Sequence, residues 1–133
     1  MRCRSNPNRG APWRVLVVED NAEVMRLLAE LLVGRGYEVV RACNGVEAMA
    51  ALTAPAPEPP HLVLLDLGLP LESGVSVLSF LRNVMQSGLP VVVLTGRADP
   101  EEESAVRELG VSAYLRKPAS PEKVLAAISD ALG

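Results

Sequence analysis

The stretch Leu62-Val63-Leu64-Leu65-Asp66 is a short apolar run that ends abruptly in a carboxylate. Two further runs share this pattern, Val15-Leu16-Val17-Val18-Glu19-Asp20 and Val91-Val92-Val93-Leu94-Thr95, and a fourth, Ala113-Tyr114-Leu115-Arg116, leads into Lys117-Pro118. Continuous apolar runs of this length are typical of parallel strands that are covered on both faces. Because the carboxyl ends of parallel strands open onto one edge of a sheet, the polar residues that end these runs are expected to converge there.

Segments with helical spacing separate the strands. Helix-start signals stand at Asn21, at the capping box Asn44-Gly45-Val46-Glu47, at Asp99-Pro100 and at Ser120-Pro121. A further helix is expected at about 74–86, with one apolar face made of Val77, Leu78, Leu81, Val84 and Met85. A further strand is expected at about 37–41, and the Pro-rich run at 55–60 is expected to be a linker within the domain. Five strands that alternate with five helices predict an α/β fold with right-handed crossovers and helices on both faces of a parallel sheet.

The first of these helices is apolar over a wide arc. Its core stripe is predicted at i, i+3, i+4 spacing, in Val24, Leu27, Leu28, Leu31 and Leu32. A second set, Ala22, Met25 and Ala29, either forms a small apolar patch beside Asp20 or belongs to a broad buried face.

Length and composition favour one folded domain. The chain has 133 residues, 49% of them apolar, which suits a single core. Residues 1–12 are polar and rich in Pro and Gly, so we expect a flexible tail there and the folded domain at 13–133. No apolar run approaches the ~18 residues of a membrane helix, and the N-terminus lacks a signal-peptide core, so a cytoplasmic protein is expected. Cys3 and Cys43 lie far apart and are expected to be ordinary thiols.

Charge is distributed unevenly. The net charge is −3, but the first 18 residues carry four arginines and no acid, so the remaining 115 hold 9 basic and 16 acidic residues and a charge of −7. An acidic domain of this kind is not expected to bind a nucleic-acid backbone by itself. No membrane association is expected either.

The polar residues at the strand ends suit phosphoryl chemistry. Glu19, Asp20 and Asp66 would repel one another unless a cation joined them, and their hard oxygen ligands favour Mg²⁺. The Lys117 ammonium and the Thr95 hydroxyl would complete a site for a phosphoryl group on Asp66.

In these motifs the chain resembles the receiver domains of bacterial two-component response regulators. The resemblance rests on Glu19-Asp20, on Asp66-Leu67-Gly68-Leu69-Pro70 followed by Gly74, on Thr95-Gly96, and on Tyr114 three residues before Lys117-Pro118. It implies a flavodoxin-like (βα)5 three-layer sandwich with a parallel five-stranded sheet in the order 2-1-3-4-5.

The same resemblance implies a role for each site residue. Asp66 would be the phosphoacceptor; Asp20 would bind Mg²⁺ directly and Glu19 through water, with Asp66 and the Gly68 backbone carbonyl as further ligands. Lys117 and Thr95 would contact the phosphoryl group. Thr95 and Tyr114 would switch together, and a cis Lys117–Pro118 bond would aim the lysine. Gly68 and Arg97 occupy positions where the family varies and where side chains influence the access of water.

Partners follow from the resemblance as well. The phosphoryl group would come from a sensor histidine kinase or a histidine phosphotransfer protein. An output partner would bind the face made by the fourth helix, the fifth strand and the fifth helix, and a homodimer is possible. The chain would then be a signalling module, not an enzyme, and it could be a stand-alone receiver or a fragment of a DNA-binding regulator or hybrid kinase.

Two rival functions fit the sequence less well. A phosphatase of the haloacid dehalogenase type wants a second Asp two residues after the nucleophile, where this chain has Gly68. A flavin carrier needs an anion-binding loop after the first strand, where Glu19 and Asp20 would repel a phosphate. The one histidine, His61, is expected at a solvent-facing strand edge and not as a phosphodonor.

Overall fold

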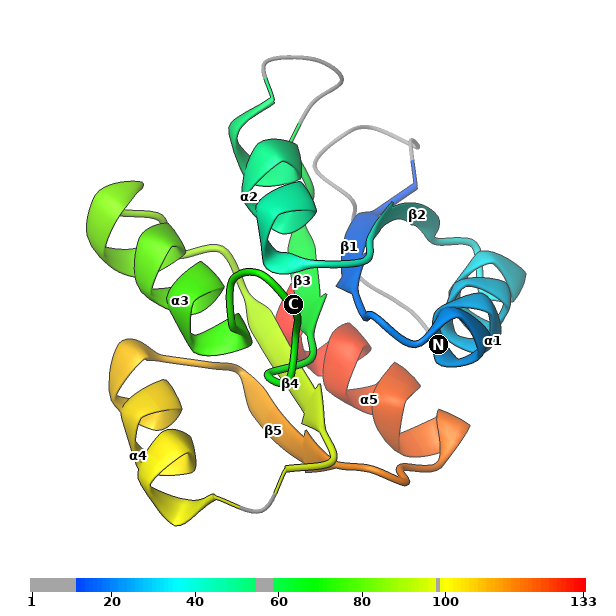
Figure 1. Ribbon diagram of the computed structural model, residues 1–133. Coiled ribbons are helices and arrows are strands. Elements are labelled where there is room, and N and C mark those ends of the chain that lie inside the picture. The colour runs from blue at the N-terminus through cyan, green and yellow to red at the C-terminus, as the bar shows by residue number, and fades with distance from the viewer. Residues whose placement is uncertain (1–11, 55–58, 98) are drawn as a thin grey trace.

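The computed structural model describes residues 12–54, 59–97 and 99–133, and it has five parallel strands in the order β2-β1-β3-β4-β5 (Figure 1). The strands are β1 (Arg14–Val18), β2 (Glu38–Ala42), β3 (Leu62–Leu65), β4 (Val91–Thr95) and β5 (Ala113–Arg116). The helices are α1 (Ala22–Gly34), α2 (Gly45–Thr53), α3 (Gly74–Ser79) with a π-helical turn η1 (Phe80–Val84), α4 (Pro100–Leu109) and α5 (Pro121–Leu132). The fold class and strand order predicted from the sequence are confirmed.

Two apolar layers hold the sheet between helices. On one face, alternate strand residues such as Leu16, Val63 and Val93 pack against α2, α3 and α4. On the other face, their neighbours Val17, Leu64 and Val92 pack against α1 and α5. Figure 1 shows the two groups of helices on opposite sides of the strands. Because both faces are covered, β1, β3 and β4 are apolar at nearly every position.

Each of the five helices begins at a side-chain cap. Asn21, Asn44, Ser73, Asp99 and Ser120 each accept a hydrogen bond from a backbone amide of the first turn. The predicted capping box at Asn44 is modified, since the Glu47 carboxylate accepts from the Cys43 amide at 2.8 Å and not from the amide of Asn44. These caps fix where each helix leaves the loops at the edge of the sheet.

The prediction for the buried face of α1 is wrong in part. Leu28 and Leu32 are buried as expected, but Leu27 is 54% exposed, and Met25 and Ala29 are buried in its place. Of the two alternatives for Ala22, Met25 and Ala29, the broad buried face is confirmed for Met25 and Ala29, whereas Ala22 is exposed. The buried arc of α1 is thus broader than the predicted stripe: Met25 lies in the same core cluster as Leu28 and Leu32, Val24 and Leu31 pack against that cluster, and Leu27 lies outside it.

The third helix also departs from its predicted pattern. The stripe expected through Val84 and Met85 holds for Val77, Leu78 and Leu81, whereas Val84 is 68% exposed. The Met85 amide donates to the Phe80 carbonyl oxygen at 3.0 Å, the five-residue spacing of a π-helical turn. This wider turn rotates Val84 off the buried face.

Several predictions fall on residues outside the described part of the chain. The flexible tail at 1–12 lies there except for Pro12, as does Cys3, and the Pro-rich connection before β3 is described only at Pro59 and Pro60. Among the described residues, no helix is long and apolar enough to cross a membrane.

Candidate phosphoacceptor site

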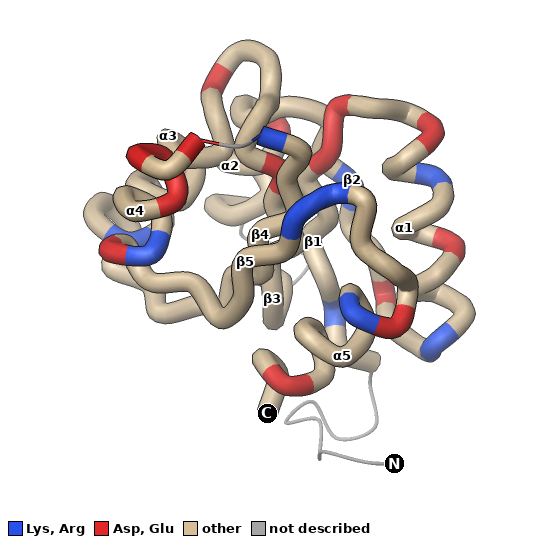
Figure 2. The backbone as a smooth tube through the Cα atoms, turned by 90° about the horizontal axis from the view of Figure 1, so that it is seen from below, with Lys and Arg blue, Asp and Glu red and all other residues tan. Residues whose placement is uncertain are grey.

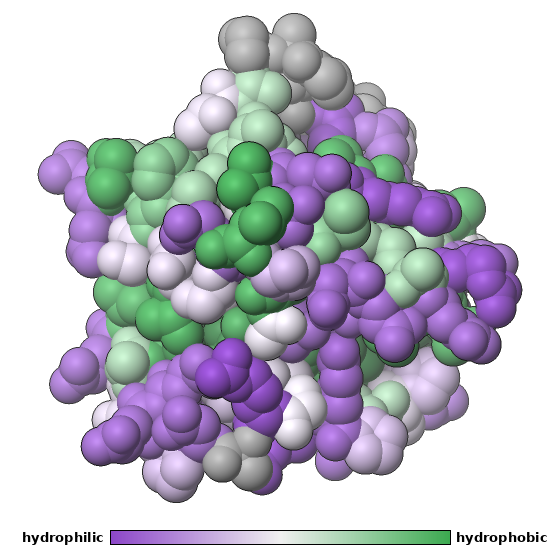
Figure 3. Space-filling view, in the orientation of Figure 1, coloured by the Kyte–Doolittle hydropathy of each residue, from purple (hydrophilic) through white to green (hydrophobic). Residues whose placement is uncertain are grey.

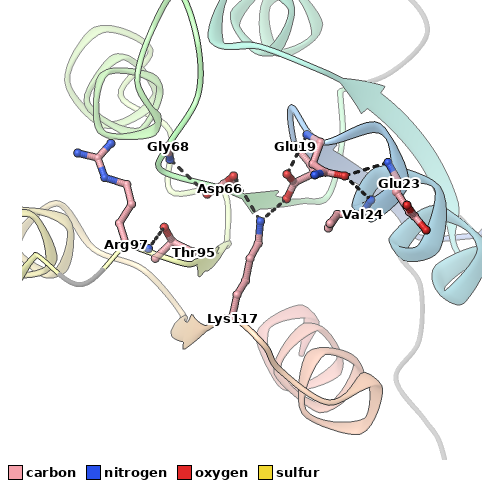
Figure 4. A network of polar contacts seen from close by, with 9 residues as sticks. Glu19, Glu23, Val24, Asp66, Gly68, Thr95, Arg97 and Lys117 are labelled. Carbon is pink, nitrogen blue, oxygen red and sulfur yellow. Dashed lines mark hydrogen bonds and ion pairs between the residues drawn. The ribbon is translucent and has the colours of Figure 1, made fainter.

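Backbone hydrogen bonds between neighbouring strands continue to the residues that directly follow the strands, and these are the candidate functional residues. The Glu19 amide donates to the Ala42 carbonyl at 3.0 Å, the Asp66 amide to Val18 at 3.0 Å, and the Lys117 amide to Thr95 at 2.9 Å. The sheet hydrogen bonding thus continues into the loops. For this reason Glu19, Asp66 and Lys117 meet at the carboxyl edge although they are far apart in sequence (Figure 4).

Three carboxylates cluster at this edge. One oxygen each of Glu19, Asp20 and Asp66 lies within 4.8 Å of the others, with Glu19 and Asp66 buried and Asp20 exposed. Such a group of hard oxygen donors fits a divalent cation of the Mg²⁺ type, and the exposed Asp20 leaves it open to solvent. The three carboxylates predicted to hold the metal are therefore brought together.

Lys117 joins two of these carboxylates. Its Nζ lies 2.6 Å from Glu19 Oε1 and 3.4 Å from Asp66 Oδ2, and the peptide bond between Lys117 and Pro118 is cis, as predicted. Burial alone would lower the pKa of Lys117, but the hydrogen bond to Glu19 and the charges of Asp66 and Glu19 outweigh it, so this pKa lies above its ordinary value. Lys117 is consequently a cation at any physiological pH.

The second oxygen of each buried carboxylate is bound by the backbone. Glu19 Oε2 accepts a hydrogen bond from the Asn21 amide at 3.1 Å. Asp66 Oδ1 accepts one from the Gly68 amide at 3.2 Å, which orients the proposed nucleophile. Both oxygens of Glu19 are therefore bonded, one to Lys117 and one to the backbone.

The loop after Asp66 is tightly packed at its end. A β-carbon on Gly74 would lie 2.5 Å from both the Asp66 carbonyl oxygen and the Leu67 Cα, so only glycine lets α3 begin against the acceptor segment. The middle of the loop, between Leu67 and Gly74, is exposed to solvent and carries an apolar side chain, Leu71, which is 75% exposed. Figure 3 shows this loop as a green patch in the middle of the face.

The two expected switch residues lie on neighbouring strands. Thr95 is fully buried, and its Oγ1 accepts a hydrogen bond from the Arg97 amide at 3.2 Å. Tyr114 is half-buried against the α2, α3 and α4 core, and the Arg107 guanidinium lies 5.3 Å from its ring centroid. Strand pairing places Tyr114 beside Val93, two residues from Thr95.

Arg97 has a contact that sequence reasoning did not predict. Its side chain passes over Gly68, where a β-carbon would lie 3.2 Å from Arg97 Cδ, and its Nε lies 3.4 Å from Glu102 Oε1 on α4. The acidic first turn of α4 was a signal for a helix start, but nothing in the spacing indicated this pairing.

His61 lies at the opposite edge, away from the carboxylates. Its Nδ1 accepts a hydrogen bond from the Arg14 amide at 2.8 Å, and its ring meets Trp13 edge to face at 5.0 Å between centroids. These contacts are structural, at the start of β1.

Comparisons with known proteins agree with this geometry. Residues 15–129 match the family model of the response regulator receiver domain. The chain is 38% identical over 118 residues to the transcriptional regulatory protein KdpE of Mycobacterium tuberculosis; the match covers 89% of this chain and 50% of that protein. The chain therefore spans about half the length of this relative.

A second relative is matched along nearly its whole length. The polar-differentiation response regulator DivK of Brucella anthropi is 35% identical over 123 residues, which cover 92% of this chain and 98% of DivK. Among solved structures, a response regulator receiver protein from Pseudomonas putida is 32% identical with a TM-score of 0.84, covering 91% of this chain and 98% of that one. A receiver domain protein from Methanospirillum hungatei is 28% identical, also with a TM-score of 0.84, covering 91% and 94%.

Proposed function

This chain belongs to the family of response regulator receiver domains, and on that premise we propose that it is a switch phosphorylated on Asp66 by a histidine of a partner protein. The observation that carries the proposal is the setting of Asp66: it is nearly buried, it lies within the acidic cluster, and Lys117 contacts it. Receiver domains are signalling modules, and we propose that this one acts in the cytoplasm.

The transfer needs few parts. An oxygen of the Asp66 carboxylate attacks the phosphorus as the P–N bond of the partner's phosphohistidine breaks and its electron pair passes to the imidazole nitrogen. Asp20, Glu19, Asp66 and the Gly68 carbonyl would hold Mg²⁺, which when bound spreads the charge on the phosphoryl oxygens. Lys117 offers a compact positive charge to the same oxygens and Thr95 a hydroxyl.

An apolar groove beside the site suits a helical partner that carries the histidine. The groove has a volume of about 820 Å³ and lies between α1 and α5, with Leu27, Leu31, Leu94 and Pro118 in its lining. Lys117 lines it too, so the groove leads to the acceptor site. A sensor histidine kinase or histidine phosphotransfer protein that docks an amphipathic helix there would bring its imidazole toward Asp66.

The output surface we propose is the face of α4, β5 and α5. Figure 2 shows acidic residues gathered on α4 and a basic segment between β5 and α5. Three of these acidic residues, Glu101, Glu102 and Glu103, lie in the first turn of α4. A partner, or a second copy of the chain, with a complementary charge pattern would be recognised there.

Since KdpE is twice as long as the match, a receiver within a larger DNA-binding regulator is the second candidate function.

Replacement of Asp66 by Asn tests the proposal. The amide keeps the shape of the side chain but removes the nucleophile, so Asp66→Asn should take up no phosphate from radiolabelled acetyl phosphate, whereas the wild type is labelled. Asp20→Asn, which leaves the nucleophile in place, should slow labelling and raise the Mg²⁺ concentration needed. Circular dichroism controls for folding, and full labelling of Asp66→Asn would refute the proposal.

A further inference from the structure

The charge balance of the site changes when Asp66 is phosphorylated. Three carboxylates and Lys117 sum to about −2, which one divalent cation neutralises. Phosphorylation converts the Asp66 carboxylate into an acyl phosphate, which replaces one negative charge by roughly two, so the occupied site is left about one charge short. Lys117 cannot supply it, because it is already shared between Glu19 and Asp66.

Arg97 is placed to supply that charge. Its side chain covers Gly68, whose amide binds Asp66, and the missing side chain of Gly68 leaves the space that Arg97 occupies. Figure 4 shows Arg97 on the opposite side of Asp66 from Glu19. A guanidinium there would meet the phosphoryl group from the side that neither Lys117 nor the acidic cluster fills.

The present partner of Arg97 is a weak one. Arg97 Nε lies 3.4 Å from Glu102 Oε1, outside hydrogen-bond geometry, and the Arg97 side chain is 49% exposed. Among the described residues, Glu102 Oε1 and the Tyr114 hydroxyl are the buried side-chain atoms without a hydrogen-bond partner. A doubly charged phosphoryl group offers a guanidinium two parallel hydrogen bonds, which is the stronger arrangement.

We propose that Arg97 is a second phosphoryl-binding cation. It pairs with Glu102 while Asp66 is unmodified, and its guanidinium moves from that carboxylate to the phosphoryl group when Asp66 is phosphorylated. The proposal rests on phosphorylation of Asp66 as set out above. It gives Glu102 a defined part: the carboxylate competes with the phosphoryl group for one guanidinium. Once Arg97 has left, Glu102 on the first turn of α4 is a hydrogen-bond acceptor without its cation. It lies near Tyr114, whose hydroxyl has no hydrogen-bond partner.

The exchange also accounts for how α4 could move. Within the described chain, α4 buries only Val106 and packs mainly against α3. Its C-terminal end is tied by Arg82, which donates to the carbonyls of Leu109 and Gly110, and its N-terminal end by the Arg97–Glu102 pair. Loss of the second tie leaves α4 free to pivot about the first.

The test measures the affinity of beryllofluoride, the noncovalent stand-in for the phosphoryl group, by amide NMR titration with Mg²⁺ present. Arg97→Ala should weaken binding about tenfold, the effect of one charge-assisted hydrogen bond. Glu102→Gln should strengthen binding, because the competitor is gone. In the Arg97→Ala background, Glu102→Gln should have no effect on affinity.

The opposite signs distinguish exchange from a merely structural ion pair. If Arg97 and Glu102 only stabilised the fold, both substitutions would weaken binding, and that outcome, or wild-type affinity for Arg97→Ala, overturns the inference. Arg26→Ala and Glu30→Gln, which break a comparable exposed pair on α1, are the matched controls and should bind as wild type. If the wild type itself does not bind beryllofluoride, or Asp66→Asn binds it equally, the proposed function fails instead.

Discussion

At the scale of single residues, Lys117 connects two carboxylates that differ in what they can do. It lies 0.8 Å closer to Glu19 than to Asp66, the difference between 2.6 and 3.4 Å. Glu19 therefore holds the ammonium beside Asp66, the proposed nucleophile. This relation was not predicted, because the sequence pairs Glu19 with the metal and gives no sign that its long side chain reaches Lys117.

Tyr114 permits a prediction about pH. Burial, then the charges of Glu103 and Glu102, raise the pKa of its hydroxyl, and Arg116 and Arg107 offset them only in part. In a Tyr37→Phe background, where Tyr114 is the one tyrosine, the ultraviolet absorbance of tyrosinate should appear above the ordinary pKa of about 10. Glu103→Gln should move that transition toward lower pH.

The sign for stability follows from linkage. Since the unfolded chain loses the Tyr114 proton at a lower pH than the folded chain, the free energy of unfolding should fall as the pH rises through the unfolded pKa, and level off above the folded one. Replacement of Tyr114 by Phe removes this component of the pH dependence. A Tyr114 transition at or below the unfolded value would contradict the burial of the hydroxyl.

At the scale of elements, Arg82 secures the C-terminal end of α4. Its guanidinium donates to the carbonyls of Ser87, Leu109 and Gly110 at 2.8 to 3.3 Å, and burial lowers its pKa. Arg82→Ala leaves these carbonyls without their donor, so the free energy of unfolding should fall by about 1–3 kcal/mol in urea titration. Arg82→Lys should restore only part, because an ammonium cannot reproduce the fork.

Arg26→Ala is the control for the loss of an arginine. Arg26 is exposed and pairs with Glu30 at 3.3 Å within α1, so its removal should cost no more than about 0.5 kcal/mol. Equal losses for Arg26→Ala and Arg82→Ala would show that the three carbonyl contacts do not anchor the helix.

The sequence predicted elements better than it predicted their faces. Strand positions and helix starts followed from apolar runs and cap residues, and each of these acts over a few neighbouring positions. The buried arc of α1 and the π-helical turn after α3 did not, because both depend on how a helix meets the sheet. Gly74 stood out only through the resemblance, whereas the structure shows the backbone contact that requires it.

At the scale of the whole molecule, the site and the proposed output face are joined through Thr95. Its hydroxyl accepts from the Arg97 amide, and β4 pairs with β5 so that Thr95 lies opposite Arg116, two residues beyond Tyr114. In the proposed switch, two routes lead from Asp66 to α4 and β5, one through the Thr95 hydroxyl and one through the Arg97 side chain. Packed side chains with discrete arrangements convert such local shifts into a change of surface.

Removal of the Thr95 hydroxyl should uncouple the two regions. Beryllofluoride with Mg²⁺ should shift amide resonances across residues 99–116 in the wild type, and Thr95→Ala should lose most of these shifts while Asp66 still accepts phosphate. Thr95→Ser keeps the hydroxyl and should retain them.

The phosphoryl group biases the surface only by its differential affinity for the two states, typically about 1–3 kcal/mol, so the coupling should appear as a similar difference in beryllofluoride affinity between wild type and Thr95→Ala. Thr53→Ala is the matched control, since that hydroxyl bonds only to carbonyls of its own helix among the contacts described. If Thr95→Ala showed the same beryllofluoride-induced amide shifts as the wild type, the Thr95 hydroxyl would not be needed for the coupling. The coupling between Asp66 and α4 would then be assigned to the Arg97 side chain alone.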